Sequence, residues 1–234
     1  MSYVHANGCT VYFEEYGAGA PLLLLPDMIG TIESEWRRFV PEFSRYFHTI
    51  AIDLRGHGKT DNPAGTITLP MLLEDLHGLM DTLEIETARV CGSGLGGLIA
   101  FLHGVRRPGS VECLVAHGTR LLWSRAESGR RAAEILSSST GEADQVALTK
   151  CVAGLVENLH EDGPGALDIS QAAFPVLLTI GGDADAAEKD LASHTLSHIP
   201  EGKLMTIPGA GSALRTVPKA EFLGPALGFL GAGF

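Results

Sequence analysis

The chain has 234 residues, of which 45% are hydrophobic and 19% charged, and its formal net charge is −11. This composition is ordinary for one globular domain of α/β size. The negative charge argues against a nucleic-acid or anionic-membrane surface, because such surfaces need clustered Lys and Arg. No apolar run is long enough to span a membrane, and the N-terminal segment lacks the pattern of a secretory signal. We therefore expect a cytoplasmic protein whose four cysteines, none in a C-x-x-C motif, are reduced.

Strands and helices are predicted to alternate in the first half of the chain. The run PLLLLP at 21–26 is continuously apolar, which is typical of a strand buried on both faces. Residues 69–85 carry leucines at helical spacing and predict an amphipathic helix. Further strands are expected at 10–17, 48–58, 88–92 and 111–118, and a further helix at 95–109. This alternation predicts an α/β fold with a mostly parallel sheet and helices on both faces.

The alternation stops between residues 121 and 173. Two helices, expected at 121–136 and 142–159, follow each other with no strand between them. We interpret residues 121–173 as a small helical cap inserted into a core of residues 1–120 and 174–234. Alternation then resumes with strands at 174–182 and 202–209 and helices at 185–199 and 218–230.

The glycine-rich segment CGSGLGG, residues 91–97, has two interpretations. Gly92, Gly94 and Gly97 fit G-x-G-x-x-G, a dinucleotide-binding motif. That motif follows the first strand of its sheet, whereas four predicted strands precede this one. The nearest acidic candidate for a ribose, Glu112, lies at the wrong end of the next strand. The alternative is the nucleophile elbow G-x-S-x-G of hydrolases, with Gly94 in the place of the serine.

Five segments in the same order resemble the landmarks of the α/β-hydrolase family, over nearly the whole chain. They are PLLLLPDMIGT, IAIDLRGHGKTD, VCGSGLGGLIA, PVLLTIGGDAD and LMTIPGAGSALRTVP. The resemblance implies a mostly parallel eight-stranded sheet with helices on both faces and a small helical cap. It also assigns a position to each member of the Ser-His-Asp triad.

Two of the three triad positions depart from the family pattern. The nucleophile position is Gly94, and Ser93 stands one residue too early to replace it. The histidine position is Ser212, and no histidine follows His198 anywhere in the chain. A hydroxyl cannot take up a proton near neutral pH as an imidazole does. The resemblance therefore implies a degenerate triad without nucleophile or base.

Two carboxylates are candidates for chemistry at this site. The acid position of the triad falls on Asp185, with Asp183 as the alternative, although Asp185 could instead cap a helix. Asp27 follows Pro26 where the family has His-Gly, and we expect its carboxylate near the elbow. There the N–H groups of Met28 and Leu95 would form an oxyanion pair. Asp27 could act as an acid or base, hydrogen-bond to loop amides or face solvent.

The histidines add one candidate base. His117 ends a predicted strand at the ligand-binding edge of the sheet, whereas His57 is expected to brace its turn. His194 and His198 have i, i+4 spacing without an apparent third ligand, so we predict neither a metal nor a cofactor. The predicted catalytic residues are Asp27, Asp185 and His117. The predicted substrate-binding residues are Met28, Ser93, Gly94, Leu95, Ser212 and Trp123.

These residues leave three functional hypotheses. The first is a non-hydrolytic enzyme, such as a lyase, cyclase, isomerase or decarboxylase, acting on a small, partly hydrophobic carbonyl compound. The second is a catalytically inert pseudo-hydrolase that binds a ligand or regulates a partner. The third is an altered form of an ordinary esterase or lactonase. The expected partner is a small molecule, not a nucleic acid or a membrane, and a homodimer is left open.

Overall fold

The computed structural model describes residues 2–122, 124–137, 143–157 and 169–232. Their core is an eight-stranded sheet with the strand order β1-β2-β4-β3-β5-β6-β7-β8. β1 and β2 pair antiparallel, β2 pairs antiparallel with β4, and the other neighbours are parallel. The strands are β1 Ser2–Ala6, β2 Cys9–Tyr16, β3 Pro21–Leu25, β4 His48–Ile52, β5 Ala88–Ser93, β6 Val111–His117, β7 Val176–Gly181 and β8 Gly202–Ile207. The prediction of a mostly parallel eight-stranded sheet is confirmed.

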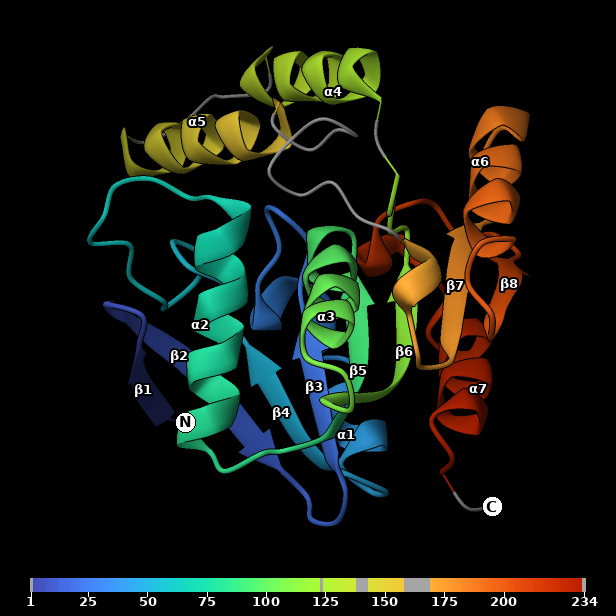
Figure 1. Cartoon of the computed structure of the whole chain (residues 1–234), viewed down its shortest axis with the longest axis horizontal. Coiled ribbons are helices and arrows are strands. Elements are labelled where there is room, and N and C mark those ends of the chain that lie inside the picture. The colour runs from blue at the N-terminus through green and yellow to red at the C-terminus, as the bar shows by residue number, and fades with distance from the viewer. Residues whose placement is uncertain (1, 123, 138–142, 158–168, 233–234) are drawn as a thin grey trace.

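Helices cover both faces of this sheet (Figure 1). The α-helices are α1 Val40–Phe43, α2 Leu69–Thr82, α3 Leu95–Arg106, α4 Arg125–Ser137, α5 Ala143–Glu157, α6 Ala186–Leu196 and α7 Lys219–Phe229. The short helices are the π-helix η1 Ile32–Trp36 and the 3-10 helices η2 Ile169–Gln171 and η3 Leu214–Thr216. α2 and α3 pack on one face, and α1 and α7 lie on the other.

Local sequence explains these elements. The four leucines of β3 are at most 1% exposed, because β3 is central and its two faces meet two separate apolar clusters. Thr68 accepts a hydrogen bond from the N–H of Met71 and so caps α2 at its start. β1 was not among the predicted strands. It pairs with β2 through a turn in which Asn7 and Gly8 both have positive φ, the arrangement favoured in tight hairpins.

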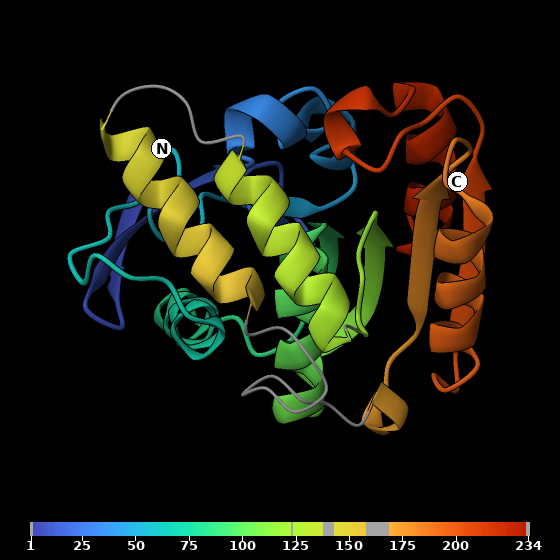
Figure 2. The same ribbon diagram turned by 90° about the horizontal axis from the view of Figure 1, so that it is seen from above.

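The two helices of the proposed cap lie side by side across the carboxyl end of the parallel strands (Figure 2). α5 falls within its predicted segment, α4 extends one residue beyond its own, and no strand separates them in the described part of the chain. The division into core and cap stays a prediction. Among the described residues no helix is both long and apolar enough to cross a membrane.

Candidate functional site

The turn between β5 and α3 carries the glycine-rich segment. Gly94, the N-cap of α3, has φ 47° and ψ −113°, which side chains rarely tolerate. Its N–H donates to the carbonyl oxygen of His117 at 2.9 Å and so ties the turn to β6. A Cβ atom at Gly96 would overlap the backbone of Leu25 and Pro26. Glycine thus permits both the sharp turn and the close approach of α3 to the sheet.

The carboxylate of Asp27 fills this turn. Its Oδ1 accepts hydrogen bonds from the N–H groups of Met28, at 2.7 Å, and Leu95, at 2.8 Å. A Cβ atom placed on Gly94 would overlap the same carboxylate. The two backbone groups predicted as an oxyanion pair therefore converge on one point, and the chain's own carboxylate occupies it. Asp27 does hydrogen-bond to loop amides, and it does so at the place where a nucleophile side chain would stand.

Several bonds hold the Asp27 loop in position. The carbonyl oxygen of Asp27 accepts from the N–H of Gly30 at 2.9 Å, which closes a turn. The N–H of Asp27 donates to Oε2 of Glu35 at 3.0 Å. Nε2 of the buried His57 lies 2.6 Å from the carbonyl oxygen of Met28, and Nδ1 lies 2.9 Å from that of Arg55. His57 therefore braces both its own turn and the Asp27 loop.

Glu35 is a residue of this site that the sequence analysis missed. Only 1% of it is exposed. Burial raises the pKa of its carboxyl to about 7, and the negative charge of Asp27 contributes to the increase, whereas the N–H of Asp27 lowers the pKa. Glu33, two residues earlier, is also a glutamate, but its side chain is 77% exposed. The sequence alone does not indicate which of the two is buried. Only the packing of η1 distinguishes them.

His117 lies at the end of β6 and is fully buried. Its Nε2 lies 3.1 Å from the carbonyl oxygen of Gly211, and its Nδ1 lies 2.9 Å from Oγ1 of Thr179. Burial lowers its pKa to about 4, although the bond to Gly211 and the charges of Asp27 and Asp183 act in the opposite direction. The ring is thus neutral at pH 7, and protein atoms contact both of its nitrogens in this conformation.

The two candidates for the triad acid differ in their surroundings. Asp185 is exposed and is the N-cap of α6, where Oδ1 accepts from the N–H of Glu188 at 2.8 Å. Asp183 lies against the segment that leads to Ser212, since a Cβ atom on Gly211 would be 3.4 Å from its Oδ2. Asp185 thus caps a helix, whereas the alternative, Asp183, lies beside the segment that leads to the predicted histidine position.

The remaining predicted residues are not all gathered at the turn. Ser93 is 1% exposed, and its hydroxyl lies near the carboxyl group of Glu35, whose pKa it lowers. Trp123 lies outside the described residues. His194 and His198 have their ring centroids 4.8 Å apart, and no cluster of three potential metal ligands occurs within the described ranges.

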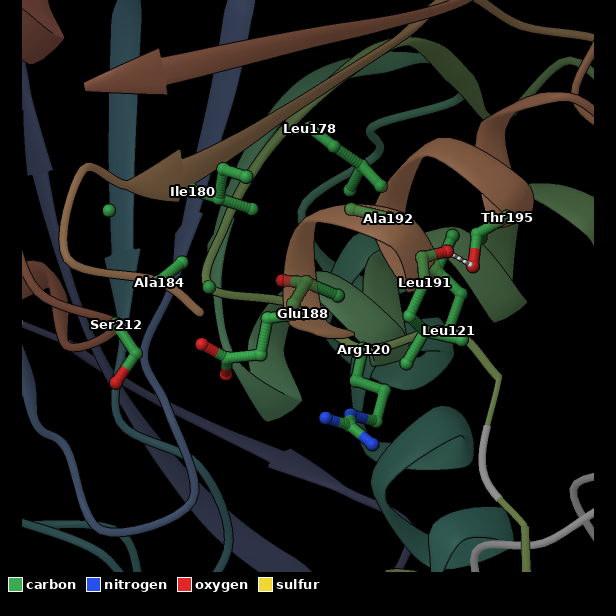
Figure 3. A pocket seen from close by; sticks show the side chains of 13 residues that line it. Arg120, Leu121, Leu178, Ile180, Ala184, Glu188, Leu191, Ala192, Thr195 and Ser212 are labelled. Carbon is green, nitrogen blue, oxygen red and sulfur yellow. Dashed lines mark hydrogen bonds between the residues drawn. The ribbon is translucent and has the colours of Figure 1, made fainter. Parts of the chain in front are cut away.

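A pocket of about 70 Å³ lies between the carboxyl ends of β6 and β7 and helix α6 (Figure 3). Its walls include Leu178, Ile180 and Leu191, and Ser212 stands at one end. Arg120 also lines it and forms an ion pair with Glu127 of α4. Ser212, the predicted histidine position, thus borders a small and mainly apolar pocket.

Comparisons with known proteins agree with this fold. A family model described as alpha/beta hydrolase fold matches residues 20–139. The chain is 32% identical over 131 residues to 3-oxoadipate enol-lactonase 1 of Acinetobacter baylyi, covering 56% of this chain and 48% of that protein. It is 32% identical over 119 residues to 2-hydroxymuconate semialdehyde hydrolase of a Pseudomonas species, covering 49% of this chain and 41% of that one. The matches span about half the length of these relatives.

Solved structures resemble the fold over almost the whole chain. A carboxylesterase of Nitrososphaera gargenis has a TM-score of 0.82 at 21% identity, covering 98% of this chain and 97% of its own. The enol-lactonase of Burkholderia xenovorans has a TM-score of 0.72 at 20% identity, covering 98% and 99%. At these identities the likeness concerns the fold alone. With the family model matching just over half of its residues, the chain belongs to the alpha/beta hydrolase fold family.

Proposed function

We propose that this protein is a non-hydrolytic enzyme that transfers protons at a small, partly hydrophobic carbonyl compound, with Asp27 as the transferring group. One observation carries the proposal: Oδ1 of Asp27 lies on the N–H groups of Met28 and Leu95, over the side-chain-free Gly94. An acyl-enzyme needs a nucleophile at this point, and glycine supplies none. Proton transfer needs only a base and a group that stabilises an enolate.

In the proposed reaction the substrate's carbonyl oxygen displaces Asp27 from the two N–H groups. The freed carboxylate takes a proton from the carbon next to the carbonyl. The electron pair of the C–H bond moves into an enolate, whose oxygen the N–H groups of Met28 and Leu95 stabilise. Asp27 then returns the proton to the same or another carbon, so the base is regenerated. The small apolar pocket beside Ser212 would take a small apolar group of the substrate.

The same observation also supports an inert ligand-binding protein as the second candidate. If Asp27 never leaves the two N–H groups, no substrate oxygen can reach them. The third candidate, an esterase or lactonase, is supported by the relatives, which include an enol-lactonase and a semialdehyde hydrolase. It requires a nucleophile other than residue 94.

Two assays separate the three candidates. The first is solvent deuterium incorporation, followed by NMR, into a panel of small 2-oxo and 3-oxo esters and lactones. We expect exchange with the parent protein, a loss of about 10²-fold or more in Asp27→Asn, and no change in the exposed control Glu33→Gln. The second is mass spectrometry after treatment with a fluorophosphonate, for which we expect no adduct. A serine adduct would overturn the proposal in favour of hydrolysis. Exchange that persists in Asp27→Asn, or is absent from the parent, would also overturn it.

A further inference from the structure

The carboxyl group of Glu35 is hydrogen-bonded to the backbone of Asp27, the residue whose own carboxylate fills the Gly94 turn. Oε2 of Glu35 accepts the N–H of Asp27 at 3.0 Å, while the side chain of Asp27 accepts the N–H groups of Met28 and Leu95. Glu35 is 1% exposed, so its charge is poorly screened from Asp27. A proton on one carboxyl group therefore affects the other.

Glu35 has little room to move. A Cβ atom on Gly30 would lie 2.5 Å from its Cδ, so its carboxyl group is packed against the turn that follows Asp27. The N–H of Glu35 donates to the carbonyl oxygen of Thr31 at 3.1 Å. Asp27 is only partly buried, so it is the carboxyl group that can respond by changing position.

The other charged groups around Glu35 come from neighbouring elements. Asp53 follows β4 and accepts the N–H of Ile32, the first residue of η1, at 2.8 Å. Arg215 of η3 lowers the pKa of Glu35, but less than burial raises it. The hydroxyl of Ser93, at the end of β5, carries no charge and also lowers the pKa of Glu35. The surroundings as a whole oppose a negative charge on Glu35, and its pKa of about 7 follows from them.

We propose that Glu35 is a positioning residue whose protonation state decides whether the carboxylate of Asp27 stays on the N–H groups of Met28 and Leu95. When Glu35 is neutral, Asp27 remains on both groups. When Glu35 loses its proton to solvent, like-charge repulsion drives the carboxylate of Asp27 away and frees the pair for another oxygen. This role of Glu35 rests on the proposed function in one respect, namely that a substrate oxygen replaces Asp27 on the two N–H groups.

The test needs no substrate, so its failure is distinguishable from a failure of the proposed function. The amide ¹H and ¹⁵N shifts of Met28 and Leu95 are followed by NMR from about pH 5.5 to about pH 8.5. We expect both amides to change together with a midpoint near 7, as their bond to Asp27 is lost. The inflection should vanish in Glu35→Gln, which keeps an oxygen for the N–H of Asp27, and should remain in the exposed control Glu33→Gln.

A second measurement uses the parent protein alone. With ¹³C-labelled glutamate carboxyls, one glutamate resonance should titrate with the same midpoint as the two amides. Amides of Met28 and Leu95 that do not change across this range would overturn the inference. It would equally be overturned by an inflection that survives in Glu35→Gln, or by the absence of a glutamate titrating near pH 7.

Discussion

At the scale of single residues, Gly94 and the carboxylate of Asp27 depend on each other. The carboxylate fills the volume that a side chain at position 94 would need, and Gly94 alone fits both that volume and a φ of 47°. A serine at residue 94 and a carboxylate on the two N–H groups cannot coexist. Gly94 and the hydrogen-bonded carboxylate of Asp27 are therefore one structural feature, not two.

This exclusion predicts strong coupling between the two positions. Gly94→Ser should destabilise the protein by about 1–3 kcal/mol, because it strains the turn and expels Asp27 from its hydrogen bonds. In an Asp27→Ala background, Gly94→Ser should reduce the stability by a smaller amount, because no carboxylate has to move. Urea unfolding of the parent, both single variants and the double variant gives the coupling energy. Additive effects would show that the carboxylate does not occupy this volume in solution.

Introducing a serine at residue 94 should not confer ester hydrolysis by itself. The predicted histidine position is Ser212, and protein atoms contact both nitrogens of the buried imidazole of His117. Groups of a triad act as a unit, so Gly94→Ser should stay inactive on nitrophenyl esters, as should Ser212→His. The combination of both with Asp27→Ala should exceed the sum of its parts. Activity in Gly94→Ser alone would identify an unrecognised base at the site.

Glu35 should make the protein less stable as the pH rises. Its pKa is about 7 in the folded state, against an ordinary value of 4.5, so the folded state holds the proton more tightly. This contribution is complete below pH 4.5 and is lost as the pH rises through about 7. The difference corresponds to about 3 kcal/mol. Glu35→Gln should therefore raise the melting temperature more at pH 8 than at pH 5, whereas Glu33→Gln should not; equal effects at both pH values would contradict this.

At the scale of elements, the interface between helices α2 and α3 contains a buried pair of histidines. His77 and His103 pack with ring centroids 4.5 Å apart and are 6% and 1% exposed. Both nitrogens of His103 and Nε2 of His77 lack hydrogen-bond partners within the described residues. Burial lowers the pKa of His77 and brings that of His103 to about 3. The two helices thus meet across neutral imidazoles that resist protonation.

This pair predicts sensitivity to acid. The contribution of His103 to stability is present above its ordinary pKa of 6.5 and is lost as the pH falls towards about 3. His103→Leu should flatten the pH dependence of urea unfolding in that range. It should also stabilise the protein at pH 7 by about 1–2 kcal/mol, because two unpartnered buried nitrogens are removed. The exposed control His198→Asn should leave the slope unchanged; an unchanged slope in His103→Leu would contradict the assignment.

The sequence predicts those features that depend on local patterns, and it does not predict those that depend on packing between distant segments. β3 and α2 follow from apolar runs and helical periodicity, which are local. β1 was missed although Asn7-Gly8 is a hairpin signal, because its exposed outer residues lack a strong apolar pattern. The resemblance to the family singles out Asp27 as a candidate residue near the Gly94 turn. The role of Glu35 could not be foreseen, because its burial arises from packing between distant segments.

At the scale of the whole molecule, the proposed cap shares its apolar core with the sheet. Ile135 of α4 and Val152 and Leu155 of α5 belong to the same buried cluster as the residues of α2 and α3. Leu148 of α5 also lies 3.4 Å from a Cβ atom placed on Gly56, in the turn after β4. A segment joined to the core in this way should unfold together with it.

Leu155→Ala tests this cooperativity. The side chain is 4% exposed, and its truncation should cost about 2–5 kcal/mol of stability. The chain has two tryptophans, so a Trp123→Phe background leaves Trp36, in the cluster on the opposite face of the sheet, as the fluorescent reporter. If the chain unfolds as one unit, Leu155→Ala should shift the Trp36 transition and the far-UV circular dichroism transition by the same amount. The exposed control Glu157→Ala on the same helix should shift neither. A Trp36 transition that stays in place while the circular dichroism splits into two steps would show that the cap folds independently of the sheet that it covers.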